Sequence, residues 1–180
     1  MKQLMITVKP EYLVDILNGN KTLELRTYIP KDFVGWVNVY CGKGKPYLYK
    51  LDDNGNYYIT NVKVNNEIYI LNGKVVCRFW FDEHIAYKYY EDDNSYFPKR
   101  PQDFGYQAEP VLKRLCLTRD EFKAYGNGKD LYAWHIKQLE IFDEPKELGE
   151  FQNYYRKEKI DYEPLTHAPQ KYAYVWGKEE

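Results

Sequence analysis

Three charged residues near the N-terminus have the types and spacing that could do chemistry. Lys21, Glu24 and Arg26 lie in the stretch Gly19-Asn20-Lys21-Thr22-Leu23-Glu24-Leu25-Arg26. Residues two apart in an extended strand point to the same side, so Glu24 and Arg26 are expected side by side, with Lys21 close to them. A compact ammonium, a planar guanidinium and a carboxylate acceptor suit phosphate oxygens and nucleobase edges. The alternative is an ordinary surface ion pair, worth ~0 to 1 kcal/mol.

The elements around this stretch are predicted to position it. A short apolar strand over 4–8 stops at Pro10, and Pro10 suits the first turn of a helix. Leu13, Ile16 and Leu17 recur at helical spacing, and Asn18-Gly19 supplies a left-handed end. Residues 22–29 then alternate. The pattern predicts a strand with one buried face and one face open to water, which carries Thr22, Glu24, Arg26 and Tyr28.

The rest of the chain reads as short strands with few short helices. Strands are expected at 35–41, 74–81, 131–142 and 172–176, and Thr118 with Glu121 forms a capping box for a helix that closes at Gly126. Residues 47–71 resemble a β-ribbon inserted into the fold, and residues 91–105 an exposed loop. We therefore predict one α+β domain over residues 1–180, built as a small β-barrel or sheet.

Composition narrows the class of protein. The net charge of -1 excludes the simplest nucleic-acid signature, a strongly basic chain. No apolar run is long enough for a membrane span or a signal peptide, so neither membrane insertion nor export is expected. The three cysteines and three histidines are scattered, which predicts no disulfide framework, no metal and no cofactor, and favours a reducing cytoplasm.

The spacing Gly19-x-Lys21-x-x-Glu24-x-Arg26 resembles the ASCH family, a branch of the PUA-like superfamily. Downstream, Tyr132-Ala133-Trp134-His135-Ile136 resembles the late strand of that family, and Phe142-x-x-Pro145-Lys146-x-Leu148 resembles the Pro-x-x-Leu segment after it. Ala168-Pro169-Gln170-Lys171-Tyr172 resembles the closing Pro-Gln-aromatic segment common in phage- or prophage-type members. The resemblance implies a pseudo-barrel of about six strands with flanking helices and a cleft that takes RNA or a nucleoside-type ligand. It implies that Lys21, Glu24 and Arg26 line the cleft, with Lys43 and Lys45 at its rim.

Three functions stay open at this point. The first is a module that binds RNA or a modified nucleobase, with Glu24 accepting from an exocyclic amine and the cations contacting oxygens. The second is a hydrolase acting on RNA or on N4-acylated cytidine, with Lys21 and Glu24 as acid and base. Some compact ASCH proteins resemble amidohydrolases that use a Thr three residues after the Lys, but here that position is Glu24. The third is a phage or prophage protein-interaction module whose Tyr-rich ribbon binds another protein by pairing through a strand edge.

Overall fold

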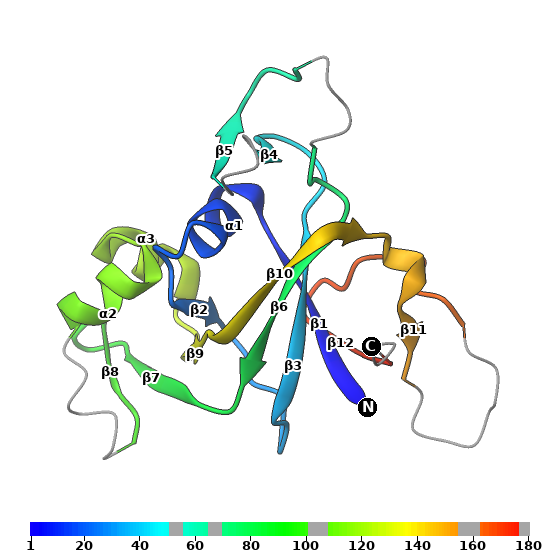
Figure 1. The fold of residues 1–180 in the computed structure, drawn as a ribbon. Coiled ribbons are helices and arrows are strands. Elements are labelled where there is room, and N and C mark those ends of the chain that lie inside the picture. Colours follow the sequence, from blue (N-terminus) through cyan, green and yellow to red (C-terminus); the bar gives the residue numbers. More distant parts are fainter. Residues whose placement is uncertain (51–55, 65–69, 101–107, 155–162, 177–180) are drawn as a thin grey trace. The chain divides into compact units, whose positions relative to one another are not determined.

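The computed structural model describes residues 1–50, 56–64, 70–100, 108–154 and 163–176. The chain divides into two compact units (Figure 1). The first contains Met1–Asn18, Gly35–Trp80 and Gln138–Glu180, and the second contains Gly19–Val34 and Phe81–Lys137. Lys21, Glu24 and Arg26 all fall in the second unit. The prediction of a single domain over 1–180 stays a prediction.

A six-stranded sheet forms the first unit, in the order β10-β6-β3-β1-β12-β11. Its strands are β1 (Lys2–Val8), β3 (Gly35–Cys41), β6 (Val75–Phe81), β10 (Lys137–Lys146), β11 (Gln152–Asn153) and β12 (Ala173–Trp176). β1 runs parallel to β3 and antiparallel to β12. A cluster that includes Met5, Tyr40, Val75 and Val175 fills its core. The strands expected at 4–8, 35–41 and 172–176 therefore form.

Helix α1 (Pro10–Leu17) begins at the proline that the sequence indicated, and Leu13, Ile16 and Leu17 are buried. It packs against the hairpin of β4 (Tyr47–Lys50) and β5 (Tyr57–Thr60). The Asn18 side chain ties the two together, because it donates to Tyr57 O at 2.9 Å and accepts from Tyr57 N at 3.0 Å. This hairpin is the described part of the expected ribbon. Residues 51–55 and 65–69 lie outside the described residues, and its status as an insertion stays a prediction.

The second unit holds a four-stranded sheet in the order β2-β9-β7-β8. Its strands are β2 (Leu23–Arg26), β7 (His84–Tyr90), β8 (Ser95–Pro98) and β9 (Leu131–His135). Helices α2 (Ala108–Leu115) and α3 (Arg119–Gly126) contribute to the core of this unit. Leu23 and Leu25 of β2 pack there with Val111, Leu115 and Phe122. The capping box of Thr118 and Glu121 is present, although the left-handed C-cap is Asn127 (φ 44°) and not Gly126.

Two expectations about strands are corrected. The strand predicted over 131–142 is two strands in different sheets, because Ile136 lies in neither strand and Gln138, the second residue of β10, has a positive φ of 46°. The loop predicted over 91–105 contains β8, which pairs with β7 through Tyr89 and Tyr96. A turn that ends in the left-handed Asn94 (φ 45°) lets these aromatic strands pair. Residues 101–105 lie outside the described residues.

The described residues form mostly β-sheet with three α-helices, an α+β arrangement. In that part of the chain a small strand pair, β4 with β5, makes a third sheet. Within the described ranges none of these sheets closes on itself, so the barrel and its expected count of about six strands are not confirmed. A 3-10 turn, η3 (Leu148–Glu150), links β10 to β11. Among the described residues no helix has the length and apolar character needed to cross a membrane.

Candidate functional site

The start of β2 is held by backbone hydrogen bonds to two other elements of its unit. Gly19 takes a left-handed conformation (φ 75°), which suits the turn that leads into the strand. Thr22 N then donates to Arg114 O at 3.0 Å, and Thr22 O accepts from Ile136 N at 3.1 Å. Residues 21–26 are therefore fixed between the end of α2 and the end of β9.

Lys21, Glu24 and Arg26 form one ion cluster. Glu24 Oε1 lies 2.9 Å from Arg26 Nη2, and Glu24 Oε2 lies 3.3 Å from Lys21 Nζ. Lys21 Nζ also donates to the Leu115 carbonyl at the end of α2, at 3.2 Å. The structure thus brings together the three residues that the sequence singled out, with the carboxylate between the two cations.

The cluster is buried, which corrects the expectation of a face open to water. Lys21, Glu24 and Arg26 are 4%, 5% and 7% exposed, and every residue of β2 is buried. Alternation of side chains showed correctly that Glu24 and Arg26 oppose Leu23 and Leu25, but it carries no information on what covers each face. The ion pair is therefore no ordinary surface pair. Removing one member of a buried pair typically costs about 3–5 kcal/mol.

Arg26 is embedded among groups that favour its charge. Burial by itself lowers the pKa of Arg26, but the Glu24 carboxylate and the hydroxyls of Tyr28 and Tyr125 raise it above its ordinary value. Arg26 shares side-chain hydrogen bonds with both tyrosines. Burial raises the pKa of Tyr125 to about 12, and Arg26 only partly opposes this. At neutral pH Tyr125 is therefore a hydrogen-bonding hydroxyl beside a permanent cation.

Aromatic residues share the strand face of the ion cluster. Glu24 lies opposite Trp134, and Trp134 lies opposite His84 on the next strand. Arg26 lies opposite Tyr132 in the same way. Trp134 is fully buried and contacts the rings of Tyr28 and Phe81, at centroid distances of 6.0 and 4.8 Å. The sequence had marked Trp134 and Tyr132 only as part of a late strand, because nothing in it fixes the register between β2 and β9.

Two buried polar atoms in this row lack a hydrogen bond to any described residue. They are Glu24 Oε2, an acceptor, and Trp134 Nε1, a donor. Buried polar atoms are hydrogen-bonded in the large majority of cases, so each exception calls for a reason. An acceptor and a donor on directly opposite residues could meet the donor and acceptor of one small polar group.

Comparison with known proteins bears on the fold. No protein-family model and no curated protein sequence matches this chain. Among solved structures, the crystal structure of ASCH from Zymomonas mobilis covers 97% of this chain and 87% of that chain, with a TM-score of 0.54 and 13% sequence identity. A serine-to-alanine mutant of that protein matches with the same TM-score of 0.54 and identity of 13%, over 97% of this chain and 88% of that chain. The chain has an ASCH-type fold. At this identity the likeness concerns the fold alone.

The other predicted site residues of this ASCH-type fold, Lys43 and Lys45, belong to a different compact unit from the ion cluster. Lys43 and Lys45 lie on the exposed turn between β3 and β4, in the first compact unit. Their place at the rim of a ligand site stays a prediction. The ASCH-type resemblance to phage or prophage members likewise stays a prediction.

Thr22 offers no substitute for the hydroxyl that the amidohydrolase pattern requires. Its side chain is exposed, and Thr22 Oγ1 accepts a hydrogen bond from Arg114 Nε at 3.1 Å. The position three residues after Lys21 is the buried Glu24. Across the ranges that the structure describes, no three His, Cys, Asp or Glu side chains gather closely enough to hold a metal ion.

Proposed function

We propose that this chain binds RNA through a single unpaired nucleobase, which it recognises at Lys21, Glu24 and Arg26. The observation that supports this best is the buried Glu24 Oε2, which is ion-paired with Lys21 Nζ at 3.3 Å but accepts no hydrogen bond from a described residue. The exocyclic amine of cytosine or adenine is a donor of suitable chemistry for that oxygen. The ASCH-type fold agrees with a nucleic-acid ligand, because its superfamily is associated with RNA.

The burial of the cluster favours a base over a phosphate. A phosphate chain contacts exposed cations, whereas Lys21 and Arg26 are only 4% and 7% exposed. A base is planar and can enter edge-on once it is unstacked. The two cations then hold and orient the Glu24 carboxylate, with Lys21 anchored to Leu115 O and Arg26 to Glu24 Oε1. The base edge meets Glu24 Oε2, the oxygen that also lies 3.3 Å from Lys21 Nζ.

Neighbouring rings supply stacking partners. Tyr28, His84 and Tyr132 are each partly exposed, and the rings of His84 and Tyr132 lie 5.8 Å apart. Stacking of a base on an aromatic side chain contributes about 1–3 kcal/mol and tolerates any base. In this proposal Glu24 therefore provides the selectivity between bases, and the aromatic rings provide the affinity. Lys43 and Lys45 stay proposed ligand-binding residues of the first unit, and a reducing cytoplasm is the proposed location.

Titration with short single-stranded RNA tests this function. Glu24 needs a donor, and cytidine offers an exocyclic amine where uridine offers a carbonyl. We expect a labelled cytidine oligonucleotide to bind at least about tenfold more tightly than the uridine oligonucleotide of equal length, since a base-edge contact is worth about 1–3 kcal/mol. Equal affinities would remove Glu24 from recognition, and no binding of either would reject the function.

A hydrolase remains the second candidate, because Lys21 Nζ and Glu24 Oε2 are only 3.3 Å apart. A Lys-carboxylate pair at this distance can pass a proton during hydrolysis. Incubation with N4-acetylcytidine and with single-stranded RNA, followed by mass analysis, separates the two functions. Release of acetate or of shorter fragments, lost in Lys21→Met, would support the enzyme. Bound but unchanged RNA would support binding alone.

A further inference from the structure

Strand β10 lies at the end of the six-stranded sheet. Among the described residues it pairs with β6 alone, so its other edge has no neighbouring strand there. Five of the six residues from 140 to 145 are exposed, namely Glu140, Ile141, Asp143, Glu144 and Pro145. Exposure on both faces of a strand is typical of an edge. Ile141 is a large apolar residue and is 37% exposed.

Two features limit the edge to a short stretch. Gln138 has a positive φ of 46°, which breaks the extended backbone near the start of β10, and Pro145 has no N–H to donate near its end. Such features are typical protections of edge strands. Between them, residues 139–144 are extended and carry backbone N–H groups. This six-residue length is close to that of an ordinary strand.

Two cavities are lined by this same stretch of β10. One has a volume of about 560 Å³ and is lined by residues 140–146 together with Arg78 and Glu150. The other has a volume of about 240 Å³ and is lined by residues 141–145 with Lys50, Tyr57, Leu71 and Val76. An extended peptide added to a strand edge sends alternate side chains to opposite faces of the sheet. Paired cavities at one edge are the arrangement that such a peptide uses.

The two cavities differ in chemistry. The larger carries four carboxylates, from Glu140, Asp143, Glu144 and Glu150, against the two cations Arg78 and Lys146. Arg78 is already engaged, because its Nε lies 2.6 Å from Glu140 Oε2 and its guanidinium lies over the Trp36 ring at 4.4 Å. Lys146 Nζ lies 4.6 Å from the centre of the Phe142 ring. The surplus of negative charge favours a basic side chain.

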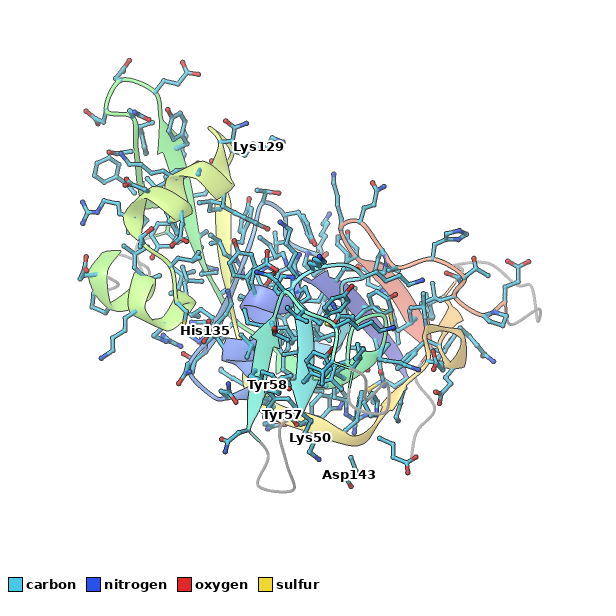
Figure 2. The ribbon with its side chains drawn as sticks, turned by 90° about the horizontal axis from the view of Figure 1, so that it is seen from above. Lys50, Tyr57, Tyr58, Lys129, His135 and Asp143 are labelled. Carbon is cyan, nitrogen blue, oxygen red and sulfur yellow. The ribbon has the colours of Figure 1, made fainter. Side chains whose placement is uncertain are left out.

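The smaller cavity is mostly apolar behind its rim. Tyr57, Leu71 and Val76 are 8%, 5% and 1% exposed, so the wall consists of packed side chains. Lys50 and Asp143 stand at its border, and Figure 2 shows both on the same side as Tyr57. An aliphatic side chain fits such a wall, since it removes apolar surface from water.

We propose that the edge of β10 docks an extended peptide segment of another protein, in which basic and aliphatic side chains alternate. The peptide pairs through its backbone with residues 139–144, places its basic side chains at the acidic cavity and its aliphatic ones at the cavity beside Tyr57. This site is independent of the nucleobase site at Glu24. Charge complementarity selects the partner, and backbone pairing provides the affinity.

The first test uses a labelled ten-residue peptide of alternating lysine and valine, titrated into the full chain by fluorescence anisotropy. A peptide of alternating glutamate and valine is the matched control. We expect saturable binding of the lysine peptide, at least about tenfold tighter than the glutamate peptide and weaker as salt is raised. Equal binding of the two peptides, or none by the lysine peptide, would overturn the proposal.

The second test determines whether the peptide binds at β10. The double variant Asp143→Lys with Glu144→Lys changes two exposed side chains. It should weaken the binding of the lysine peptide by about tenfold. Asp92→Lys with Asp93→Lys, two exposed residues of the β7–β8 turn, should leave its affinity unchanged. If both double variants weaken binding equally, the peptide binds by net charge and not at this edge.

The third test separates backbone pairing from side-chain attraction. Only one edge of the peptide can pair with β10, and alternate residues present their N–H groups to that edge. N-methylation of the lysine amides or of the valine amides blocks one peptide edge at a time. We expect one methylated peptide to lose binding and the other to keep it. Retention of binding by both forms would contradict strand pairing.

Discussion

Glu24 and Trp134 lie directly opposite each other across β2 and β9, and each holds a buried polar atom without a hydrogen bond to a described residue, although Glu24 Oε2 is ion-paired with Lys21 Nζ. The first is a carboxylate oxygen and the second an indole N–H. A cytosine presents a donor amine and an acceptor carbonyl on one edge, so it could satisfy both. The register of two strands, more than the ion cluster alone, therefore defines the proposed recognition site.

Replacing Trp134 by Phe removes the indole N–H and keeps an aromatic ring. We expect the cytidine oligonucleotide to bind about two- to tenfold more weakly, which corresponds to one neutral hydrogen bond. Trp176→Phe, at a tryptophan that is 37% exposed in the other compact unit, is the matched control and should bind as the parent does. Anisotropy titrations measure both. Unchanged affinity in Trp134→Phe would exclude the indole from the site.

The ion cluster should behave as a buried unit. Glu24→Gln leaves two buried cations without their carboxylate, so we expect it to lower the free energy of unfolding by about 3–5 kcal/mol. Replacing the whole cluster by Lys21→Met, Glu24→Leu and Arg26→Met should recover most of that loss, because no buried charge remains. Urea denaturation measures both variants.

The matched control for this prediction is an exposed ion pair. Lys99 and Asp130 lie 3.0 Å apart with side chains 45% and 35% exposed, so Asp130→Asn should cost about 1 kcal/mol or less. A loss of that small size in Glu24→Gln as well would mean that the cluster is solvated in solution and that its burial is not maintained.

The same cluster shows how far the sequence could predict the site. Alternation in residues 22–26 and the spacing after Gly19 were sufficient to group Lys21, Glu24 and Arg26. They could not show burial, because the covering residues come from distant parts of the sequence such as Leu115 and Tyr125. Trp134 was hidden for a similar reason, since strand register depends on long-range pairing.

The fold was predictable where local signals were strong. Pro10 with a helical stripe located α1, and the capping box located the start of α3. Prediction failed where one residue changed the backbone direction. An apparently continuous run divides at Ile136 into β9 and β10, beside Gln138 with its positive φ, and the acidic turn before Ser95 concealed a strand. Neither position carries a glycine or proline that would have indicated the change.

Acidification should destabilise the protein through His135, which is 8% exposed. Burial lowers the pKa of His135 below its ordinary 6.5, and the nearby Glu83 only partly opposes this. Below about pH 6.5 the unfolded chain therefore binds a proton that the folded chain does not, and stability falls as the pH drops, by at most roughly 1.4 kcal/mol per pH unit. Above that pH His135 binds no proton in either state, so it adds nothing to the dependence of stability on pH.

Urea midpoints at pH 5.5 and 7.5 measure the effect. His135→Gln should lose part of the difference between the two midpoints, whereas His167→Gln, at an exposed position, should keep the whole of it. An identical drop in the parent and in His135→Gln would assign the pH dependence to other groups.

The thiols should differ in reactivity. Cys41 and Cys77 are fully buried, and burial raises the pKa of Cys41 to about 12 and that of Cys77 further. The thiolate is the reactive form, so neither should be alkylated in the folded protein. Cys116 is partly exposed and should react first. Mass spectrometry after iodoacetamide should show one label in buffer and three in urea. Rapid triple labelling in buffer would show that the two buried positions open readily.

The proposed recognition of an exocyclic amine by Glu24 is tested most directly by one change in the ligand, because the protein then stays intact. Cytidine oligonucleotides are compared with oligonucleotides of equal length in which the central base is N4,N4-dimethylcytidine, which keeps the ring but cannot donate from that nitrogen. We predict that dimethylation weakens binding by at least about tenfold, the loss expected when a hydrogen bond to a buried carboxylate is removed. Equal affinity of the two oligonucleotides would contradict the account.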